Sequence, residues 1–137
     1  MAELRFEKAR AWLQTATSDL ESAKLLGSAP EPRRDTAIYH CQQAAEKVVK
    51  CFLVAHGEAF EKVHDIERLV SQAARLHPDF SKCAVPAAKL TPLATAYRYP
   101  DEAGFLEPTI EEFDEALQHA QVIYDFVLSL LPAEARP

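Results

Sequence analysis

Residues 38–50 of the chain read Ile38-Tyr39-His40-Cys41-Gln42-Gln43-Ala44-Ala45-Glu46-Lys47-Val48-Val49-Lys50. This pattern predicts a helix with one apolar face and one polar face. A surface helix needs only soluble side chains on its polar face, and any mixture of lysine and glutamate supplies them. Two adjacent glutamines followed by Glu46-Lys47 are a more particular choice, so this helix is the first candidate for a functional site.

The helix that contains this run is predicted from about Arg33 to His56, where Gly57 closes it. A preceding helix is predicted over about residues 3–26, with Gly27 as a left-handed stop. One face of this preceding helix is apolar and consists of Phe6, Ala9, Leu13, Ala16, Leu20 and Ala23.

Three further helical segments follow. Asp65 is expected to cap a third helix that ends at His77-Pro78. Residues 81–98 are predicted to be helical with a break at Thr91-Pro92, because Pro favours the first turn of a new helix. The sequence from Thr109 to Glu112 is a capping box that opens the last helix. Pro132 stops that helix after an apolar stripe of Ile110, Phe113, Leu117, Ala120, Tyr124, Val127 and Leu131.

The composition fits these helices. The chain has 137 residues, 48% of them hydrophobic, only 3 glycines, and no alternating β-branched runs bounded by turn pairs. The prediction is therefore a single all-α domain over residues 1–137, an antiparallel bundle of four or five helices with its core at about 5–131. No apolar run reaches about 18 residues, and the first five residues are not a signal peptide. We expect a cytoplasmic protein with no membrane contact.

Charge is distributed unevenly along the chain. Residues 1–98 hold 14 Lys and Arg against 12 Asp and Glu, a balance of +2, whereas residues 99–137 hold one base against 9 acids, a balance of −8. The acidic part is either a solvated helix face or a surface that docks a basic partner or repels nucleic acid from that side. The chain as a whole lacks a broad basic surface for duplex DNA.

Several kinds of chemistry are not indicated. Cys41, Cys51 and Cys83 are widely spaced and lack Cys-x-x-Cys or paired-His companions, which favours buried free thiols over a zinc site or a disulfide. No Gly-rich phosphate loop and no nucleophile elbow occurs in the sequence. We therefore expect no metal and no cofactor.

The polar residues that remain are candidates for binding. Gln43, Lys47 and Lys50 have i, i+4, i+7 spacing, which predicts one exposed edge of the helix. A lysine pair beside an amide could hold phosphate oxygens, but the same face could instead make hydrogen bonds within the bundle. His64 is either a phosphate or base contact, or simply the residue before the Asp65 cap.

Arg98 is the strongest single candidate. It precedes Tyr99-Pro100, and Pro100 excludes Tyr99 from the helical region, so the guanidinium is expected at a chain reversal. Its planar fork suits phosphate or carboxylate, although it could also satisfy the terminal carbonyls of the helix or pair with Asp101 or Glu102.

Three of these segments together carry a family resemblance. The run His40-Cys41-Gln42-Gln43-Ala44-Ala45-Glu46-Lys47, the entry His64-Asp65-Ile66 and the segment Arg98-Tyr99-Pro100-Asp101 resemble the HEPN family, over roughly residues 5–131. These are small prokaryotic helical domains often found beside a minimal nucleotidyltransferase. The resemblance implies a homodimer that acts with a separately encoded nucleotidyltransferase, as in toxin–antitoxin-type pairs. It also implies a link to nucleotides or RNA.

Catalytic members of the family resemble metal-independent ribonucleases with Arg, four to six residues and then His near the last long helix. Here the next His after Arg98 is His119, twenty-one positions on, and Arg34-x5-His40 lies on the wrong helix. Catalysis would need both a proton acceptor and a group that stabilises the phosphorane. Arg98 could fill only the second role, so the sequence does not predict ribonuclease activity.

The sequence thus favours a bundle that binds a nucleotide, RNA or its partner in a groove lined by Gln43, Lys47, Lys50, His64 and Arg98. The alternatives are an atypical endoribonuclease that uses Arg98 and a pure protein-interaction module. A dimer is also expected because the terminal helices carry apolar residues beyond one stripe. These extra residues are Trp12, Val122, Ile123 and Phe126.

Overall fold

The computed structural model describes residues 2–97 and 107–136, and within these ranges the regular structure is entirely helical. In chain order the elements are α1 (Ala2–Ser28), α2 (Arg34–Ala55), α3 (Ile66–Leu76), η1 (Pro78–Cys83), α4 (Ala84–Leu90), η2 (Thr91–Ala94), α5 (Ile110–Leu130) and η3 (Ala133–Ala135). The all-α prediction is confirmed. Arg98, Tyr99, Pro100 and Asp101 lie outside the described residues.

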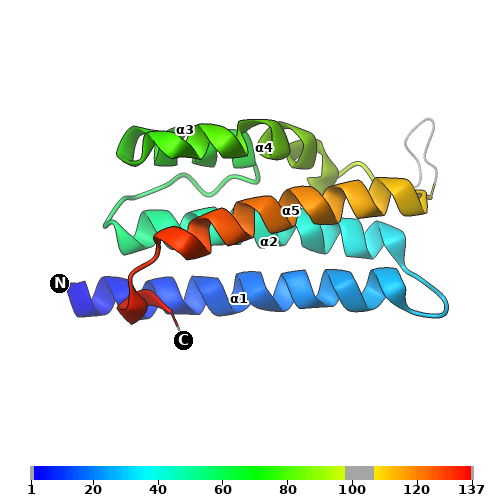
Figure 1. Ribbon diagram of the computed structural model, residues 1–137, viewed down its shortest axis with the longest axis horizontal. Coiled ribbons are helices and arrows are strands. Elements are labelled where there is room, and N and C mark those ends of the chain that lie inside the picture. Colours follow the sequence, from blue (N-terminus) through cyan, green and yellow to red (C-terminus); the bar gives the residue numbers. More distant parts are fainter. Residues whose placement is uncertain (1, 98–106, 137) are drawn as a thin grey trace.

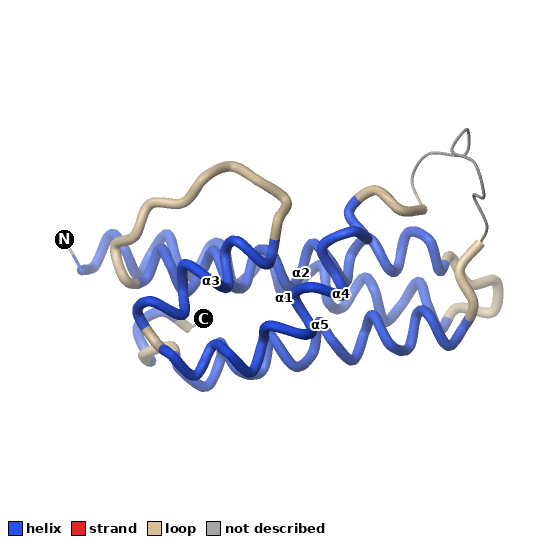
Figure 2. Tube along the Cα trace, turned by 90° about the horizontal axis from the view of Figure 1, so that it is seen from above, coloured by secondary structure: helices blue, strands red, loops and turns tan. Residues whose placement is uncertain are grey.

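Helix α2 is the centre of the bundle. It packs against α1 on one side, α5 on another, and α3 and α4 on the side away from α1 (Figure 1). Fifteen of its 22 residues are buried. A helix that meets neighbours on most sides has little surface left for water, so its polar residues must find partners inside the protein. Figure 2 shows the long irregular connection from α2 to α3, which passes beside the bundle.

Most predicted helix ends are confirmed. Asp65 accepts a hydrogen bond from the Arg68 backbone N–H at 3.2 Å and caps α3. Thr109 and Glu112 form the reciprocal capping box that opens α5. Gly57, just after α2, has a φ of 71°, a left-handed conformation that glycine adopts without a steric cost.

Gly27 was predicted wrongly. It is not a left-handed stop, because α1 continues through Ser28. A Cβ atom at this position would overlap the ring of Phe113 on α5. The glycine is therefore required by the close approach of an aromatic ring rather than by its backbone conformation.

The apolar stripe of α5 was also predicted with the wrong centre. Phe113, Ala120 and Val127 are buried as expected, but Ala116 and Ile123 are buried too. Ile110 is half exposed, and Leu117 and Tyr124 are only partly covered. Tyr124 lies at the edge of the contact, where its hydroxyl bonds the Thr17 hydroxyl at 2.8 Å. The sequence spacing fits both stripes, and the position of α5 between α2 and α4 selects the second.

The three cysteines are free and buried, as predicted. Burial raises the pKa of Cys41 and of Cys51 to about 12 and that of Cys83 to about 11. None of the described helices is both long enough and apolar enough to cross a membrane.

We expect none of these three thiols to react rapidly with a disulfide reagent at pH 8 in the native protein, and all three to react in guanidinium, because the thiolate is the reactive form. The thiol pKa of Cys41 is higher in the folded protein than in the unfolded chain. Its contribution to the free energy of unfolding is therefore complete below pH 9 and is lost as the pH rises towards 12. A thiol that reacts at once in the folded protein would contradict this burial. Metal analysis should find well under one zinc per chain.

Candidate functional site

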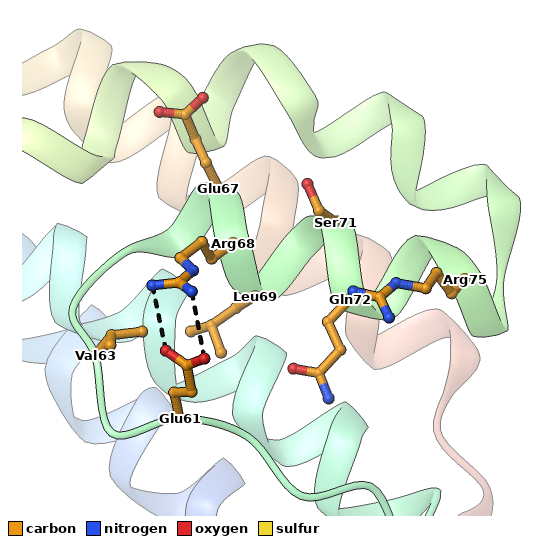
Figure 3. Close-up of a pocket in the computed structure, with 8 residues that line it drawn as sticks. All are labelled: Glu61, Val63, Glu67, Arg68, Leu69, Ser71, Gln72 and Arg75. Carbon is orange, nitrogen blue, oxygen red and sulfur yellow. Dashed lines mark hydrogen bonds and ion pairs between the residues drawn. The ribbon is translucent and has the colours of Figure 1, made fainter.

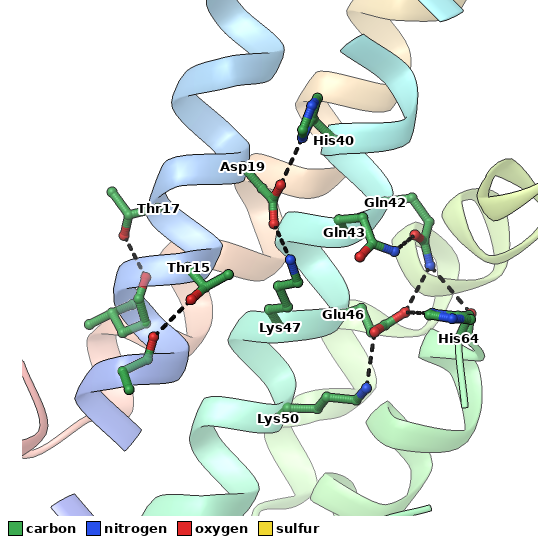
Figure 4. A network of polar contacts seen from close by, with 12 residues as sticks. Thr15, Thr17, Asp19, His40, Gln42, Gln43, Glu46, Lys47, Lys50 and His64 are labelled. Carbon is green, nitrogen blue, oxygen red and sulfur yellow. Dashed lines mark hydrogen bonds and ion pairs between the residues drawn. The ribbon is translucent and has the colours of Figure 1, made fainter. Parts of the chain in front are cut away.

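Two groups of hydrogen-bonded polar side chains lie along the middle of α2. Their members come from α1, α2 and the connection before α3, and Figure 4 shows them together. We call the two groups together the α2 polar network, and it consists of Asp19, His40, Gln42, Gln43, Glu46, Lys47, Lys50 and His64.

Asp19 forms the first half of the network. It projects from α1 and is almost fully buried, with 8% of its surface exposed. Its Oδ1 atom lies 2.7 Å from Nδ1 of His40, and its Oδ2 atom lies 2.7 Å from Nζ of Lys47. One carboxylate therefore joins an imidazole and an ammonium across the α1–α2 interface.

Glu46 repeats this arrangement on the other side of α2. Only 2% of its surface is exposed. Its Oε1 atom lies 2.8 Å from Nδ1 of His64, and its Oε2 atom lies 3.0 Å from Nζ of Lys50. Because Asp65, the next residue, caps α3, the backbone that carries His64 is fixed at the start of that helix.

Two glutamines extend the second half. Gln43 donates from Nε2 to Oε1 of Gln42 at 2.7 Å. Gln42 in turn donates to Glu46 and to the backbone carbonyl of His64, both at 3.3 Å. The Gln-Gln pair thus satisfies buried polar groups and ties α2 to the connection before α3.

Two aromatic rings close the network around Lys50. The Nζ atom lies 5.5 Å from the ring centre of Trp12 and 5.2 Å from that of Phe60, distances at which a cation is attracted to a ring face. The two rings themselves meet edge to face at 5.7 Å. Lys50 therefore joins α1, α2 and the α2–α3 connection, and its ammonium is hidden from solvent.

The chemical consequence concerns the histidines. A carboxylate bonded to Nδ1 fixes the ring orientation, so Nε2 is the nitrogen that remains for an outside ligand. The His64 side chain is 68% exposed and that of His40 is 27% exposed. His64 is therefore an imidazole on the surface whose orientation is fixed by the buried carboxylate of Glu46.

Four of the five predicted site residues, Gln43, Lys47, Lys50 and His64, lie in the network, and the fifth, Arg98, lies outside the described residues. The prediction that Gln43, Lys47 and Lys50 form an exposed edge was wrong. Gln43 and Lys50 are buried, and the Lys47 side chain is 21% exposed. The neighbours of α2 cover the face on which they lie.

The predicted site did not include Asp19, His40 or Glu46. Glu46 had a visible signal, since it stands four residues before Lys50 on one helix. Asp19 had a weaker one, as a carboxylate directly before Leu20 in the buried stripe of α1. Its partners, twenty-one and twenty-eight positions away, become visible only once α1 and α2 are packed.

A separate cavity of about 200 Å³ lies between α4, η2 and α5 and includes Tyr97 and His119. Tyr97 directly precedes Arg98 in the sequence. Burial, with the neighbouring Glu112 carboxylate, raises the pKa of Tyr97 to about 12. The hydrogen bond from Tyr97 lowers the pKa of Glu112. The described residues contain no group of three or more His, Cys, Asp or Glu placed to hold a metal ion.

Comparison with known proteins adds three findings. A family model described as HEPN domain matches residues 9–130. The crystal structure of TT1696 from Thermus thermophilus matches with a TM-score of 0.77 and 32% identity, over 90% of this chain and 98% of that one. The crystal structure of ST0689, an archaeal HEPN homologue, matches with a TM-score of 0.72 and 26% identity, over 89% and 96% of the two chains. A search of the curated proteins gave no significant match.

Proposed function

Since this chain belongs to the HEPN family, we propose that it is a binding domain that takes a phosphate group of a nucleotide or RNA at the surface of the α2 polar network. The observation that carries the proposal is His64, whose ring is exposed and oriented by Glu46. Partly exposed Lys47 supplies a positive charge on α2, one residue along the helix from Glu46. In this proposal Gln43 and Lys50 position the site from within and do not touch the ligand.

The sequence alone adds Arg98 to the proposed site. A guanidinium offers two aligned donors to a phosphate, whereas a lysine acts as a point charge. We therefore expect Arg98 to contribute more to binding than Lys47 does.

Titration of a fluorescent single-stranded RNA and of ATP tests this function. Arg98→Ala should weaken binding by about 1.5–3 kcal/mol, the range for a hydrogen bond to a charged group. Lys47→Ala should weaken it less, and added salt should shrink both effects. His64→Ala should weaken binding, whereas Lys62→Ala, a control on the same connection, should change it little.

Binding that is unchanged in both Arg98→Ala and His64→Ala would remove the phosphate site and leave a pure protein-interaction domain. The same RNA samples should be examined for cleavage. His119 and Tyr97 line one cavity, and Tyr97 directly precedes Arg98 in the sequence. Cleavage lost in both His119→Ala and Arg98→Ala would favour the alternative of an atypical ribonuclease.

The proposed partner is a separately encoded minimal nucleotidyltransferase, in a pair of the toxin–antitoxin type. A neighbouring gene for such an enzyme, and a complex of the two proteins that survives gel filtration, would support this pairing. The two co-expressed proteins eluting separately would count against it.

We also propose that the protein is a homodimer. The reasons taken from the sequence need revision, because Ile123 is buried within the chain and Trp12 packs on Phe60. The exposed apolar residues that remain include Leu4 and Leu25 on α1 and Val122 on α5. Light scattering should give twice the chain mass of 15.3 kDa at micromolar concentration. A monomer mass under these conditions would refute the dimer.

A further inference from the structure

A groove separate from the α2 polar network lies between α3 and the irregular segment 58–63. Two cavities, of about 300 and 630 Å³, form it and share Glu61, Gln72 and Arg75. Figure 3 shows the residues that line the smaller one. Gln72 holds the two walls together, because its Nε2 donates to the carbonyl of Ala59 at 2.6 Å. These volumes fall within the range of about 300–1,000 Å³ that is common for ligand pockets.

The two arginines of the groove differ in their bonding. Arg68 makes two contacts with the Glu61 carboxylate, at 3.2 and 3.3 Å. The Arg75 guanidinium has no hydrogen bond or ion pair to any residue in the described part of the chain, although it lines both cavities. Its planar fork thus offers a pair of donors to a ligand at the point where the cavities meet.

The rest of the lining limits the chemistry of that ligand. Phe60 and Leu76 give the larger cavity an apolar surface, and Leu76 is 42% exposed. Glu58, Glu61 and Glu67 line the groove as well, so it carries more negative than positive side chains. A polyanion such as RNA or a nucleoside triphosphate would be repelled more strongly than a single carboxylate, whose one charge can pair with Arg75.

We propose that this groove binds a short peptide by its free C-terminal carboxylate. Arg75 holds the carboxylate, and the last side chain of the peptide, an apolar one, packs on Phe60 and Leu76. The size of the larger cavity favours a peptide of a few residues over a single amino acid. This site goes beyond the phosphate-binding function proposed above and uses none of its contact residues.

The chain contains its own reporter for this binding. Trp12 is its single tryptophan. Its ring centre lies 5.7 Å from that of Phe60, and Phe60 lines the larger cavity. Titration of the whole protein with the tripeptide Ala-Ala-Leu should therefore change the tryptophan fluorescence. The same peptide with a C-terminal amide should bind at least ten times more weakly, and inorganic phosphate at the same concentration should not displace the acid.

Arg75→Gln should weaken binding of the acid peptide at least tenfold and should no longer distinguish it from the amide. Lys82→Gln, an exposed base outside the groove, is the control and should bind as wild type.

Equal binding of acid and amide by the wild type, or no saturable binding at millimolar peptide, would overturn the proposal. So would Arg75→Gln binding as tightly as wild type with only a lower melting temperature, since Arg75 would then serve just the C-terminal end of α3. RNA and ATP titrations of Arg75→Gln should remain unchanged, which separates this test from that of the phosphate site.

Discussion

Glu46→Gln is expected to lower the free energy of unfolding by about 3–5 kcal/mol, the usual cost of breaking a buried ion pair by removing one partner. The substitution keeps the volume of the side chain but removes its charge. Lys50 then remains as a buried ammonium with no carboxylate, 6% exposed and enclosed by Trp12 and Phe60. Urea denaturation followed by circular dichroism measures the loss.

Two further variants identify the cause of that loss. Glu115→Gln is the matched control. The Glu115 side chain is 60% exposed, and its Oε1 atom makes a long contact of 3.4 Å with Nε2 of His119. It should cost no more than about 0.5 kcal/mol. Adding Lys50→Met to Glu46→Gln should recover most of the stability, since it removes the buried ammonium that Glu46→Gln leaves unpaired. A double variant as unstable as the single one would show that the unpaired ammonium is not the cause.

Asp19 provides a graded comparison with Glu46. Both carboxylates bridge one histidine and one lysine, but Lys47 is 21% exposed on its side chain whereas Lys50 is 8% exposed. Water can solvate Lys47 when its partner is lost. The first bridge is therefore less critical to stability than the second, and Lys47 is the lysine that an outside ligand can reach.

The helix ends were readable from the sequence because they depend on neighbouring residues. Asp65, Gly57 and the Thr109–Glu112 box act through contacts within a few positions, so local rules place them. The all-α class followed for the same reason. Helical periodicity is a local property, and the bundle repeats it over most of the chain.

The exposure of the site was not readable because it depends on which elements cover α2. Polar residues at i, i+4, i+7 look like a solvated edge when one helix is considered alone. Here α1 and the connection before α3 cover that edge. Asp19 and Trp12 reach it from α1, and Phe60 reaches it from that connection. A buried lysine and an exposed one have the same letter, and only the tertiary contacts distinguish them.

The need for glycine at position 27 also depends on a contact with another helix that the local sequence does not show. Gly27→Val should destabilise the protein by about 3 kcal/mol, at the upper end of the range for overpacking. Three ring atoms of Phe113 lie within 2.6 Å of the place where a Cβ would stand, and Phe113 is only 5% exposed. The ring therefore has to move within the packed α1–α5 contact, although valine suits a helix better than glycine does.

A double-mutant cycle with Phe113 tests this reason. Phe113→Ala alone should be strongly destabilising, by about 3–5 kcal/mol, because it leaves a cavity between α1 and α5. In the Phe113→Ala background, Gly27→Val should cost nothing or should stabilise, because the ring with which it collides is gone. The coupling energy should therefore approach the full value of about 3 kcal/mol. Additive losses in the double variant would mean that Gly27 is needed for its backbone after all, and that the ring contact with α5 does not set the residue at this position.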